Sequence, residues 1–338
     1  MKEIIGIIGA GAFGSALGHA FAAAGRNVCF WARSNELVAE INNHSRNTQY
    51  MGEARFKGTP PEATINLEEL VRKSSTLVYC CPSSCLNEIL DQLKLLPDFA
   101  NKDFVNTAKG LDLKHLCLFD QRVKTRLGTH FWKHHFSMLS GPGFAKEIIA
   151  GHPTCLTLAA KKRSTIKRLQ EVLGTRFFRV YGTTDLTGVQ LGGAAKNVVA
   201  IAAGIVEGLG LGMNTKAAII NLGLGEMTRL GGKLGAKALT FRGFSGMGDL
   251  VLTCTGPQSR NRLFGYHLGQ GLSPQKAIEA IASTIEGIPT AKAIHELALS
   301  KKIDLPICAE VFKIVHQGKD LATGIDELLS RPQLDEWR

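Results

Sequence analysis

DLTGVQLGGAAKNVVAIAAGIVE, residues Asp185 to Glu207, is the stretch at which the pattern of this sequence changes. Short β-branched runs alternate with amphipathic helical segments before it, whereas helical periodicity dominates after it. Asp185 is a predicted N-cap, and the small and apolar residues that follow predict a long helix packed closely on its neighbours. The stretch therefore separates a predicted α/β domain, residues 1–188, from a predicted all-helical domain, residues 189–338.

Lys196 is the only charged residue between Leu186 and Val206. Its neighbours one helical turn away include no carboxylate, so the ammonium group must reach solvent, a distant partner or a ligand. A lysine that extends to water from a helix end is the simpler interpretation. A catalytic or binding role needs support from the rest of the chain.

The composition is that of a globular protein of about two domains, with 338 residues of which 44% are apolar and 20% charged. The formal net charge of +11 suits nucleic acid, an anionic membrane surface or small phosphorylated ligands. Basic residues are dispersed and not interleaved with aromatic ones, which argues against nucleic acid. The eight cysteines lack metal-ligand spacing, so we expect neither a metal nor a disulfide framework.

Lys2 followed by an apolar stretch is similar to the start of a signal peptide. Glu3 and four glycines between Ile5 and Ser15 contradict that interpretation. No apolar stretch is long and polar-free enough to predict a membrane span. Together with cysteines expected to be reduced, this predicts a cytoplasmic protein.

The chain begins with a predicted βαβ unit. Ile4 to Ile8 predicts a buried parallel strand, residues Gly9 to Gly14 read GAGAFG, a helix follows to Gly25, and Asn27 to Ala32 predicts a second strand. In this context G-x-G-x-x-G indicates a dinucleotide site of the Rossmann type. Its glycines permit a tight turn, close approach of a pyrophosphate and packing of the helix on the strand. A glycine-rich structural turn is the alternative.

The end of the second strand is expected to select the dinucleotide. Domains that bind NAD carry Asp or Glu there, to bind the ribose hydroxyls, but this sequence has Arg33 and Ser34. Both suit a 2′-phosphate, so NADPH is the predicted cofactor, with NADH as the alternative. Arg33 is otherwise an exposed residue at a strand end.

Five further runs predict strands of a parallel sheet: residues 76–80, 103–107, 136–139, 154–159 and 177–181. Lys109 follows one of these strands and is predicted at the carboxyl edge of the sheet, where open α/β sheets bind ligands. Residues 44–65 lack periodicity and predict a long loop. Ser83 and Ser84 are predicted to cap the helix that follows them.

The second half of the sequence has helix start and stop signals. Asn214 predicts the cap of a helix that runs to Leu230, Ser273-Pro274 begins another, and Pro306 begins a helix that stops at Gly318.

One segment of the second half is of a different kind. Gly246 to Arg262 combines glycines and hydroxyls with Ser259, Arg260 and Asn261 before a new helix. Such a segment suits a phosphate, which binds backbone N–H groups and a forked guanidinium. A capped loop with surface arginines has the same pattern.

Taken together, these motifs resemble the NAD(P)-dependent glycerol-3-phosphate dehydrogenases of the bacterial type. The resemblance covers nearly the whole chain and rests on GAGAFG, NTAKG at Lys109, SGPGFAKE from Ser140, GVQLGGAAKN ending at Asn197, GMGDLVLTCTGPQSRN from Gly246 and IEG from Ile285. It implies a Rossmann-type domain followed by an all-helical domain, with the active site between them.

The implied reaction reduces dihydroxyacetone phosphate to sn-glycerol 3-phosphate with NAD(P)H and supplies phospholipid synthesis. The resemblance also implies a cytoplasmic homodimer, without nucleic acid, membrane insertion or a metal.

Individual residues acquire roles by the same resemblance. Lys196 matches the general acid/base, Lys109 a second active-site lysine, and Asp249 the carboxylate beside them. The implied substrate-binding residues are Lys109, Gly141, Gly143, Lys196, Asp249, Thr253, Ser259, Arg260 and Asn261. The implied cofactor-binding residues are Gly9, Gly11, Ala12, Phe13, Gly14, Arg33, Lys109, Ala145, Arg260, Thr284 and Glu286.

Two positions depart from the family pattern. Gly143 stands where many relatives have Ser or Thr, so only its backbone can contact a substrate. Ala12 replaces a frequent serine of the glycine loop, which leaves Phe13 and the backbone to hold the cofactor.

The reduction needs a hydride at the carbonyl carbon and a proton for the carbonyl oxygen, and a lysine of lowered pKa can supply the proton. Burial and the cation of Lys109 are expected to lower the pKa of Lys196, whereas Asp249 is expected to raise it.

Two other functions stay open: a two-domain dehydrogenase for another substrate, and a non-catalytic NADPH-sensing module. The phosphate-type segment at Arg260 argues against the first, and the two lysines with Asp249 argue against the second.

Overall fold

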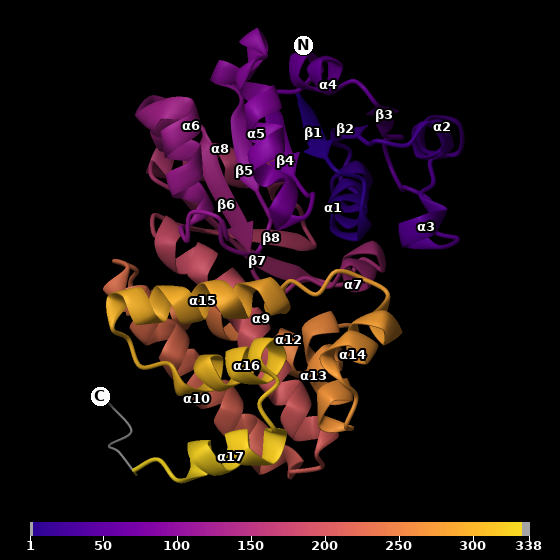
Figure 1. Ribbon diagram of the computed structural model, residues 1–338. Helices are drawn as coiled ribbons and strands as arrows, with labels where there is room; N and C mark the ends of the chain where they lie inside the picture. The colour runs from indigo at the N-terminus through magenta and orange to yellow at the C-terminus, as the bar shows by residue number, and fades with distance from the viewer. Residues whose placement is uncertain (1–2, 333–338) are drawn as a thin grey trace. The chain divides into compact units, whose positions relative to one another are not determined.

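The computed structural model describes residues 3–332, which form two compact units (Figure 1). One unit comprises residues 3–193 and 239–249, and the other comprises residues 194–238 and 250–332. These units differ from the predicted ranges, 1–188 and 189–338, in two respects. The boundary falls inside helix α9 (Leu186–Gly208), and residues 239–249 return to the first unit. The change to helical periodicity shows where the last strand ends. Tertiary contacts, which the sequence pattern does not show, decide to which unit each part of a helix belongs.

The first unit is built on an eight-stranded sheet in the order β3-β2-β1-β4-β5-β6-β7-β8. Its strands are β1 (Ile4–Ile8), β2 (Asn27–Trp31), β3 (Glu62–Thr64), β4 (Thr76–Tyr79), β5 (Asp103–Asn106), β6 (Phe136–Ser140), β7 (Thr154–Ala160) and β8 (Phe178–Thr183). All neighbours are parallel except β6 and β7. The seven predicted strands are confirmed, and β3 is an addition.

The one antiparallel pair follows from a short connection. Helix α7 (Ala145–Ile149) has five residues, a length of about 7 Å, which cannot carry the chain back along the sheet. The chain therefore returns from the edge at which β6 ends, with Ser140 paired to Thr157. Helix α8 (Arg163–Leu173) has eleven residues, and the strand after it, β8, is parallel to β7.

Helices cover both faces of the sheet. One apolar cluster packs β1 residues Ile5 and Ile7 against helices of one face, and Ile8 belongs to the cluster of the opposite face. The first face holds α1 (Ala12–Ala23), α2 (Asn35–His44), α3 (Thr48–Met51), α7 and α8. The second holds α4 (Leu67–Lys73), α5 (Leu86–Lys94) and α6 (Phe119–His134), of which α5 and α6 lie side by side in Figure 1.

The described residues of the second unit form helices and no strand, as predicted. Its helices are the later part of α9, α10 (Gly212–Lys233), most of α12 (Asp249–Thr255), α13 (Arg260–Gly269), α14 (Pro274–Ile281), α15 (Gly287–Lys301), α16 (Pro306–Gln317) and α17 (Leu321–Leu329). The short helices α11 (Ala238–Phe241) and η3 (Phe244–Gly248), a π-helix, precede α12.

Helix α9 is the long, closely packed helix that the sequence predicts. The backbone N of Gly188 donates to Oδ1 of Asp185 at 2.9 Å, which confirms Asp185 as the N-cap. A Cβ added at Gly204 would lie 2.0 Å from the carbonyl oxygen of Arg262, and one at Gly265 would lie 2.0 Å from that of Ile201. Only glycine permits α9 and α13 to approach this closely.

Some predicted local structures are confirmed and others are wrong. Ser273 caps α14, and Gly318 ends α16 with φ +69°. Asn214 does not cap a helix, because α10 begins two residues earlier at Gly212. Ser83 and Ser84 form a 3₁₀ turn, and no side chain caps α5. The predicted loop 44–65 contains α3 and β3.

Helix α9 is also the one helix, within residues 3–332, that is long and apolar enough to cross a membrane. Its most apolar window is entirely buried inside the protein. This is typical of a core helix of a soluble protein.

Candidate active site

The glycine loop after β1 has the geometry that its sequence predicts. Gly9 has φ +107°, a backbone conformation that side chains rarely adopt. A Cβ added at Gly14 would lie 2.0 Å from the carbonyl oxygen of Gly9, so this glycine lets α1 start against the strand. A Cβ added at Gly11 would meet none of the described residues within 4 Å. Packing against the described residues therefore does not require glycine at position 11, which leaves room for a ligand to approach the backbone.

The start of α1 fits an anion. Gly11 is the N-cap and has no side chain to accept hydrogen bonds from the first turn, which contains no acidic residue. The first N–H groups of a helix need external acceptors and attract negative charge. Backbone groups at Ala12 and Phe13 can therefore hold the pyrophosphate of a dinucleotide, and the loop fits such a cofactor.

Arg33 lies just beyond β2 with an exposed side chain. Ser34 is engaged in local structure, because its Oγ accepts from the backbone N of Leu37 at 3.2 Å and donates to Oε2 of Glu36 at 2.5 Å. It is the N-cap of α2. Of the two residues predicted to hold a 2′-phosphate, Arg33 is the one whose position suits that role.

Asn47 is a contact of the glycine loop that the sequence did not reveal. Its Nδ2 donates to the carbonyl oxygen of Ala10 at 2.9 Å and to Oγ of Ser15 at 2.8 Å, and its side chain is fully buried. Asn47 lies between α2 and α3, in the segment predicted as a loop. Because this segment has no hydrophobic periodicity, its sequence does not indicate that the side chain of Asn47 is buried.

We expect Asn47→Ala to weaken NADPH binding about tenfold and to change kcat at saturating NADPH less than about twofold. The substitution removes one of the two side-chain hydrogen bonds that the carbonyl oxygen of Ala10 accepts, the other coming from Oγ of Ser15 at 3.2 Å, and a hydrogen bond contributes about 0.5–1.5 kcal/mol. Fluorescence titration with NADPH measures the affinity. Asn42→Ala is the matched control, because Asn42 makes two similar bonds to Ala63 of β3. Equal losses of affinity in both variants would contradict the role of Asn47.

Lys109 brings together three segments that are distant in sequence. It lies three residues beyond β5, and its Nζ donates to the carbonyl oxygen of Gly141 at 3.0 Å and to Oδ2 of Asp249 at 2.6 Å. The side chain of Asp249 is 2% exposed and that of Lys109 is 19% exposed. A charge-assisted bond between partly buried groups is strong, so Asp249 holds the ammonium in one place.

The turn after β6 contains the next predicted site residues. Gly141 has φ +142°, which favours glycine, and its carbonyl oxygen accepts the bond from Lys109. Ala145 is the first residue of α7. A Cβ added at Gly143 would meet its nearest neighbours at 3.5 Å or more, an ordinary contact distance. The glycine at position 143 is therefore not imposed by packing.

Lys196 lies in the part of α9 that belongs to the second unit and is 6% exposed. Its Nζ donates to Oγ1 of Thr253 on α12 at 2.7 Å. Thr253 is 4% exposed. The ammonium thus does not extend to water from a helix end, and the simpler interpretation of this residue is wrong.

The predicted phosphate residues stand at the start of α13, and two of them have structural partners. Oγ of Ser259 accepts from the backbone N of Arg262 at 3.2 Å and caps the helix. Nδ2 of Asn261 donates to Oδ1 of Asn197 at 2.9 Å, while its Oδ1 accepts from the backbone N of Gly287 at 2.9 Å. Asn261 thereby joins α9, α13 and α15.

Arg260, in contrast, is exposed, and its guanidinium donates to Oγ of Ser283 at 2.9 Å. Thr284 is also exposed, in the connection between α14 and α15, and Glu286 is the N-cap residue of α15. Arg260 is thus the charged group at this helix start that can reach a ligand.

A partly buried ion cluster supports this part of α13. Oε1 of Glu207 lies 2.5 Å from the guanidinium of Arg262, and Oε2 lies 2.7 Å from Nζ of Lys216. Arg262 also donates from Nε to the carbonyl oxygen of Gly256 at 3.1 Å. Burial raises the pKa of Glu207, but the bonds from Arg262 and Lys216 outweigh that effect and leave the pKa below its usual value. The sequence pattern did not identify Glu207 or Lys216.

Comparison with known proteins relates both units to one family. The family model described as the N-terminus of NAD-dependent glycerol-3-phosphate dehydrogenase matches residues 4–166, and the one described as its C-terminus matches residues 185–326. The chain is 40% identical to glycerol-3-phosphate dehydrogenase (NAD(P)+) of Leptospira biflexa, over 97% of each chain. It is also 40% identical to the enzyme of that name from Geobacter sulfurreducens, over the full length of both.

A solved structure has the same fold. The crystal structure of glycerol-3-phosphate dehydrogenase from Coxiella burnetii superimposes with a TM-score of 0.90. The two sequences are 37% identical, and the match covers 98% of this chain and 99% of that one.

Proposed function

We propose residue roles for this chain from the premise that it belongs to the family of NAD-dependent glycerol-3-phosphate dehydrogenases. It is an NAD(P)-dependent oxidoreductase that acts on a CH–OH group, and it interconverts dihydroxyacetone phosphate and sn-glycerol 3-phosphate. The observation that carries the proposed roles is the pair of lysines held by buried partners, Lys109 by Asp249 and Lys196 by Thr253.

Lys196 is the proton donor of the reduction. A bound nicotinamide would supply the hydride for the carbonyl carbon. Nζ of Lys196 gives a proton to the carbonyl oxygen as negative charge develops there. Thr253 accepts one N–H bond of the ammonium at 2.7 Å and so orients the group. In the reverse direction the neutral amine takes the proton from the hydroxyl of sn-glycerol 3-phosphate.

Lys109 binds the substrate oxygens. Its position at the carboxyl edge of a parallel sheet, after β5, is where ligands bind in open α/β sheets. Asp249 and the carbonyl oxygen of Gly141 fix the ammonium, so its charge is already in place when substrate arrives. Little reorganisation is then needed during the reaction.

The start of α13 binds the substrate phosphate. Arg260 presents an exposed guanidinium, which matches phosphate oxygens with two parallel bonds. The backbone N–H groups at the helix start favour an anion as well. Ser259 and Asn261 support this site by capping α13 and by joining it to α9 and α15.

The decisive experiment is the rate of NADPH oxidation by the purified protein with dihydroxyacetone phosphate. Rapid oxidation that depends on the phosphorylated ketone is the expected result. A folded protein that binds NADPH but oxidises neither NADPH nor NADH with this ketone would contradict the function.

NADPH is the proposed preferred cofactor, because Arg33 follows β2 where a carboxylate would select NAD. We expect kcat/KM for NADPH to exceed that for NADH, and Arg33→Ala to reduce the ratio about tenfold or more. A guanidinium bound to a 2′-phosphate contributes about 1.5–3 kcal/mol. Parallel kinetics with both cofactors measure the ratio. A ratio that Arg33→Ala leaves unchanged would contradict the assignment.

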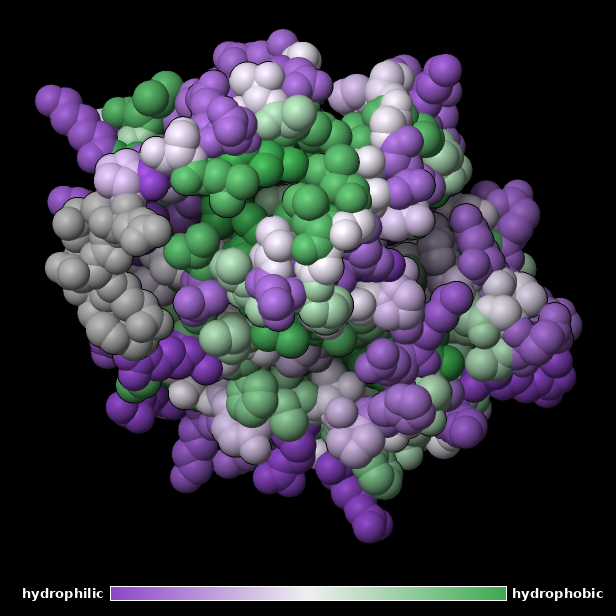
Figure 2. Space-filling model, turned by 90° about the horizontal axis from the view of Figure 1, so that it is seen from below, coloured by the Kyte–Doolittle hydropathy of each residue, from purple (hydrophilic) through white to green (hydrophobic). Residues whose placement is uncertain are grey.

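The protein is also proposed to act as a homodimer in the cytoplasm and to supply glycerol 3-phosphate for phospholipid synthesis. Large apolar side chains are exposed in the second unit, among them Leu211, Met213 and Leu222. Figure 2 shows hydrophobic residues gathered on one face, a pattern typical of interfaces. Sedimentation of a single species with the mass of one chain would contradict the dimer.

A further inference from the structure

The segment that carries Lys109 runs from Thr107 to Leu118 and joins β5 to α6. Hydrogen bonds fix its start, because Oγ1 of Thr107 donates to the carbonyl oxygen of Tyr79 at 2.7 Å and the backbone N of Ala108 donates to Oδ1 of Asn106 at 3.1 Å. Thr107 and Ala108 are buried, so the chain leaves the sheet on a defined path up to the residue before Lys109.

Asp112 fixes the segment on the C-terminal side of Lys109. Its Oδ1 accepts from the backbone N of His115 at 2.9 Å and lies 2.9 Å from the same residue's Nδ1. Its Oδ2 accepts from Nδ2 of Asn87 at 2.8 Å and lies 3.0 Å from Nε of Arg122. The side chain of Asp112 is 1% exposed. One buried carboxylate thus accepts N–H groups from its own loop, from α5 and from α6.

The charge on Asp112 is retained at neutral pH. Burial raises the pKa of this carboxyl, but the hydrogen bonds from Asn87 and His115 lower it by more, so the pKa lies below its usual value. A buried carboxylate that is fully hydrogen-bonded is a rigid anchor, whereas an uncompensated one is strongly destabilising.

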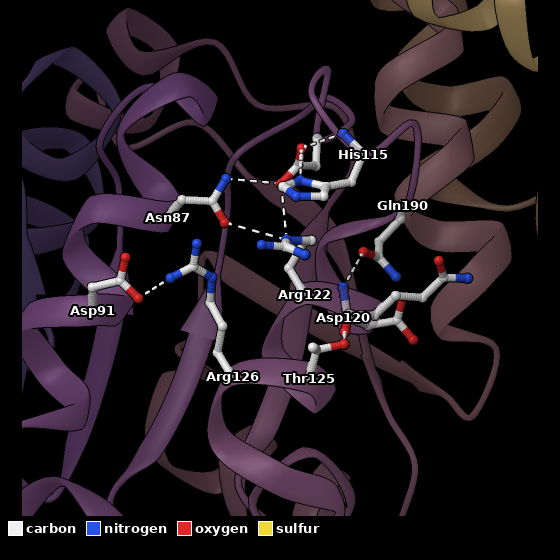
Figure 3. Close-up of polar contacts among 10 residues, drawn as sticks. Asn87, Asp91, His115, Asp120, Arg122, Thr125, Arg126 and Gln190 are labelled. Atoms are coloured by element: carbon white, nitrogen blue, oxygen red, sulfur yellow. Dashed lines mark hydrogen bonds and ion pairs between the residues drawn. The ribbon is translucent and has the colours of Figure 1, made fainter.

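The frame around Asp112 is itself cross-linked. Asn87 and Arg122 approach from α5 and α6, and Arg126 pairs with Asp91 one turn further along the same two helices (Figure 3). The start of α6 is held as well, because the backbone N of Asp120 donates to Oε1 of Gln190 at 3.0 Å. Asp112 therefore ties its loop to two helices that are also linked to each other.

We propose that Asp112 is a positioning residue that places the backbone of Lys109 for the reaction. Only two residues separate it from Lys109, whose ammonium must lie at Asp249 and at the carbonyl oxygen of Gly141. A long lysine side chain has many rotamers, so the path of its backbone decides which of them reach the reacting atoms. A misplacement of about 1 Å can cost about 100-fold in rate. The inference rests on the proposed role of Lys109.

The test compares Asp112→Asn with Asp103→Asn in the full-length enzyme. An amide at position 112 puts an NH₂ group against N–H donors, so at least one bond to α5, α6 or the loop is lost. Asp103 is the matched control: it is buried at the opposite end of β5 and pairs with Arg168 through bonds of 2.6 and 2.7 Å. Both variants lose the charge of a buried carboxylate that pairs with an arginine, but only the first loses an anchor of the Lys109 loop.

We expect Asp112→Asn to lower kcat about 10- to 100-fold and to leave the Kd for NADPH within about twofold. Asp103→Asn is expected to lower the melting temperature by a similar amount with kcat within about threefold of the wild type. Equal reductions of kcat in the two variants would show that Asp112 acts through stability alone, and would overturn the inference. An unchanged kcat in a folded Asp112→Asn protein would overturn it as well.

Lys109→Met separates this inference from the role on which it rests. The substitution removes the ammonium and keeps the length of the side chain. A large loss of kcat in Lys109→Met with none in Asp112→Asn would reject the positioning role only. Near-normal turnover in Lys109→Met would reject the role of Lys109, and with it the reason for a positioning residue.

Discussion

Lys196→Ala lowers kcat by about 100- to 10,000-fold, because the variant has no group at this position to give the carbonyl oxygen its proton. The Kd for NADPH stays within about twofold of the wild type, since the glycine loop at the start of α1 lies in the other unit of the chain. Steady-state kinetics with dihydroxyacetone phosphate and a fluorescence titration with NADPH measure the two quantities. A kcat within tenfold of the wild type would reject Lys196 as the proton donor.

Lys216→Ala is the control for this result. Lys196 and Lys216 are each 6% exposed, and each has a hydrogen-bonded oxygen at 2.7 Å. Both substitutions remove a buried ammonium from the second unit, so they are expected to have comparable effects on stability. Only Lys196→Ala should reduce turnover by orders of magnitude. Similar losses of kcat in both variants would mean that the effect of Lys196→Ala arises from damage to the helical unit.

Arg260→Ala raises the KM for dihydroxyacetone phosphate about 30- to 300-fold, with a smaller change in kcat. A guanidinium that makes two charge-assisted bonds to phosphate contributes about 2–3 kcal/mol of binding. Within residues 3–332, the one hydrogen bond of the exposed Arg260 side chain is that to Ser283. Arg260→Lys should recover part of the affinity, because it keeps the charge but loses the forked geometry.

The unphosphorylated ketone separates phosphate binding from other effects of this substitution. With dihydroxyacetone, Arg260→Ala and the wild type are expected to have nearly equal kcat/KM, because the group that Arg260 binds is missing. If the variant loses as much activity with dihydroxyacetone as with its phosphate, then Arg260 does not act on the phosphate. An unchanged KM for dihydroxyacetone phosphate would also contradict its assignment.

Local sequence was sufficient to predict the strands, turns and helix starts that are stabilised mainly by neighbouring residues. The strand Ile4 to Ile8, the turn at Gly9 and the helix that follows depend on residues within about twenty positions of one another. Each predicted strand of the sheet was found for the same reason: a run of β-branched and apolar residues suits burial on both faces. The N-caps Asp185 and Ser273 bond to N–H groups three residues away, which sequence spacing can anticipate.

Local signals failed where packing or a competing partner decided the outcome. Asn214 is a good cap by type, but α10 begins earlier, at Gly212, and Asn214 lies in its first turn. Sequence suggested that Ser34 holds a phosphate, whereas its hydroxyl is used at the start of α2. Nothing in the sequence predicted that β6 and β7 are antiparallel, because strand direction depends on how the connection crosses the sheet.

For the candidate site, sequence patterns drew attention to three cations, and only the family resemblance placed Asp249 and Thr253 near them. Lys109, Lys196 and Arg260 stand out because each is a cation in a context that suits a ligand: a strand end, an apolar helix and a helix start. Their partners are not recognisable in the same way. Asp249 is 140 residues from Lys109, and Thr253 is 57 residues from Lys196. No spacing rule connects positions so far apart in the chain.

The class of fold and the dinucleotide loop could be inferred from sequence, because they depend on local patterns and on a short motif whose chemistry is independent of the rest of the chain. The reaction was implied by the family resemblance. The folded chain was needed to identify Asn47 as a contact of the glycine loop and Asp112 as an anchor of the Lys109 loop, and to show which of the two lysines Asp249 binds. A buried polar side chain looks the same in sequence as an exposed one. Only the folded chain shows which donors and acceptors meet there, and burial makes those contacts strong.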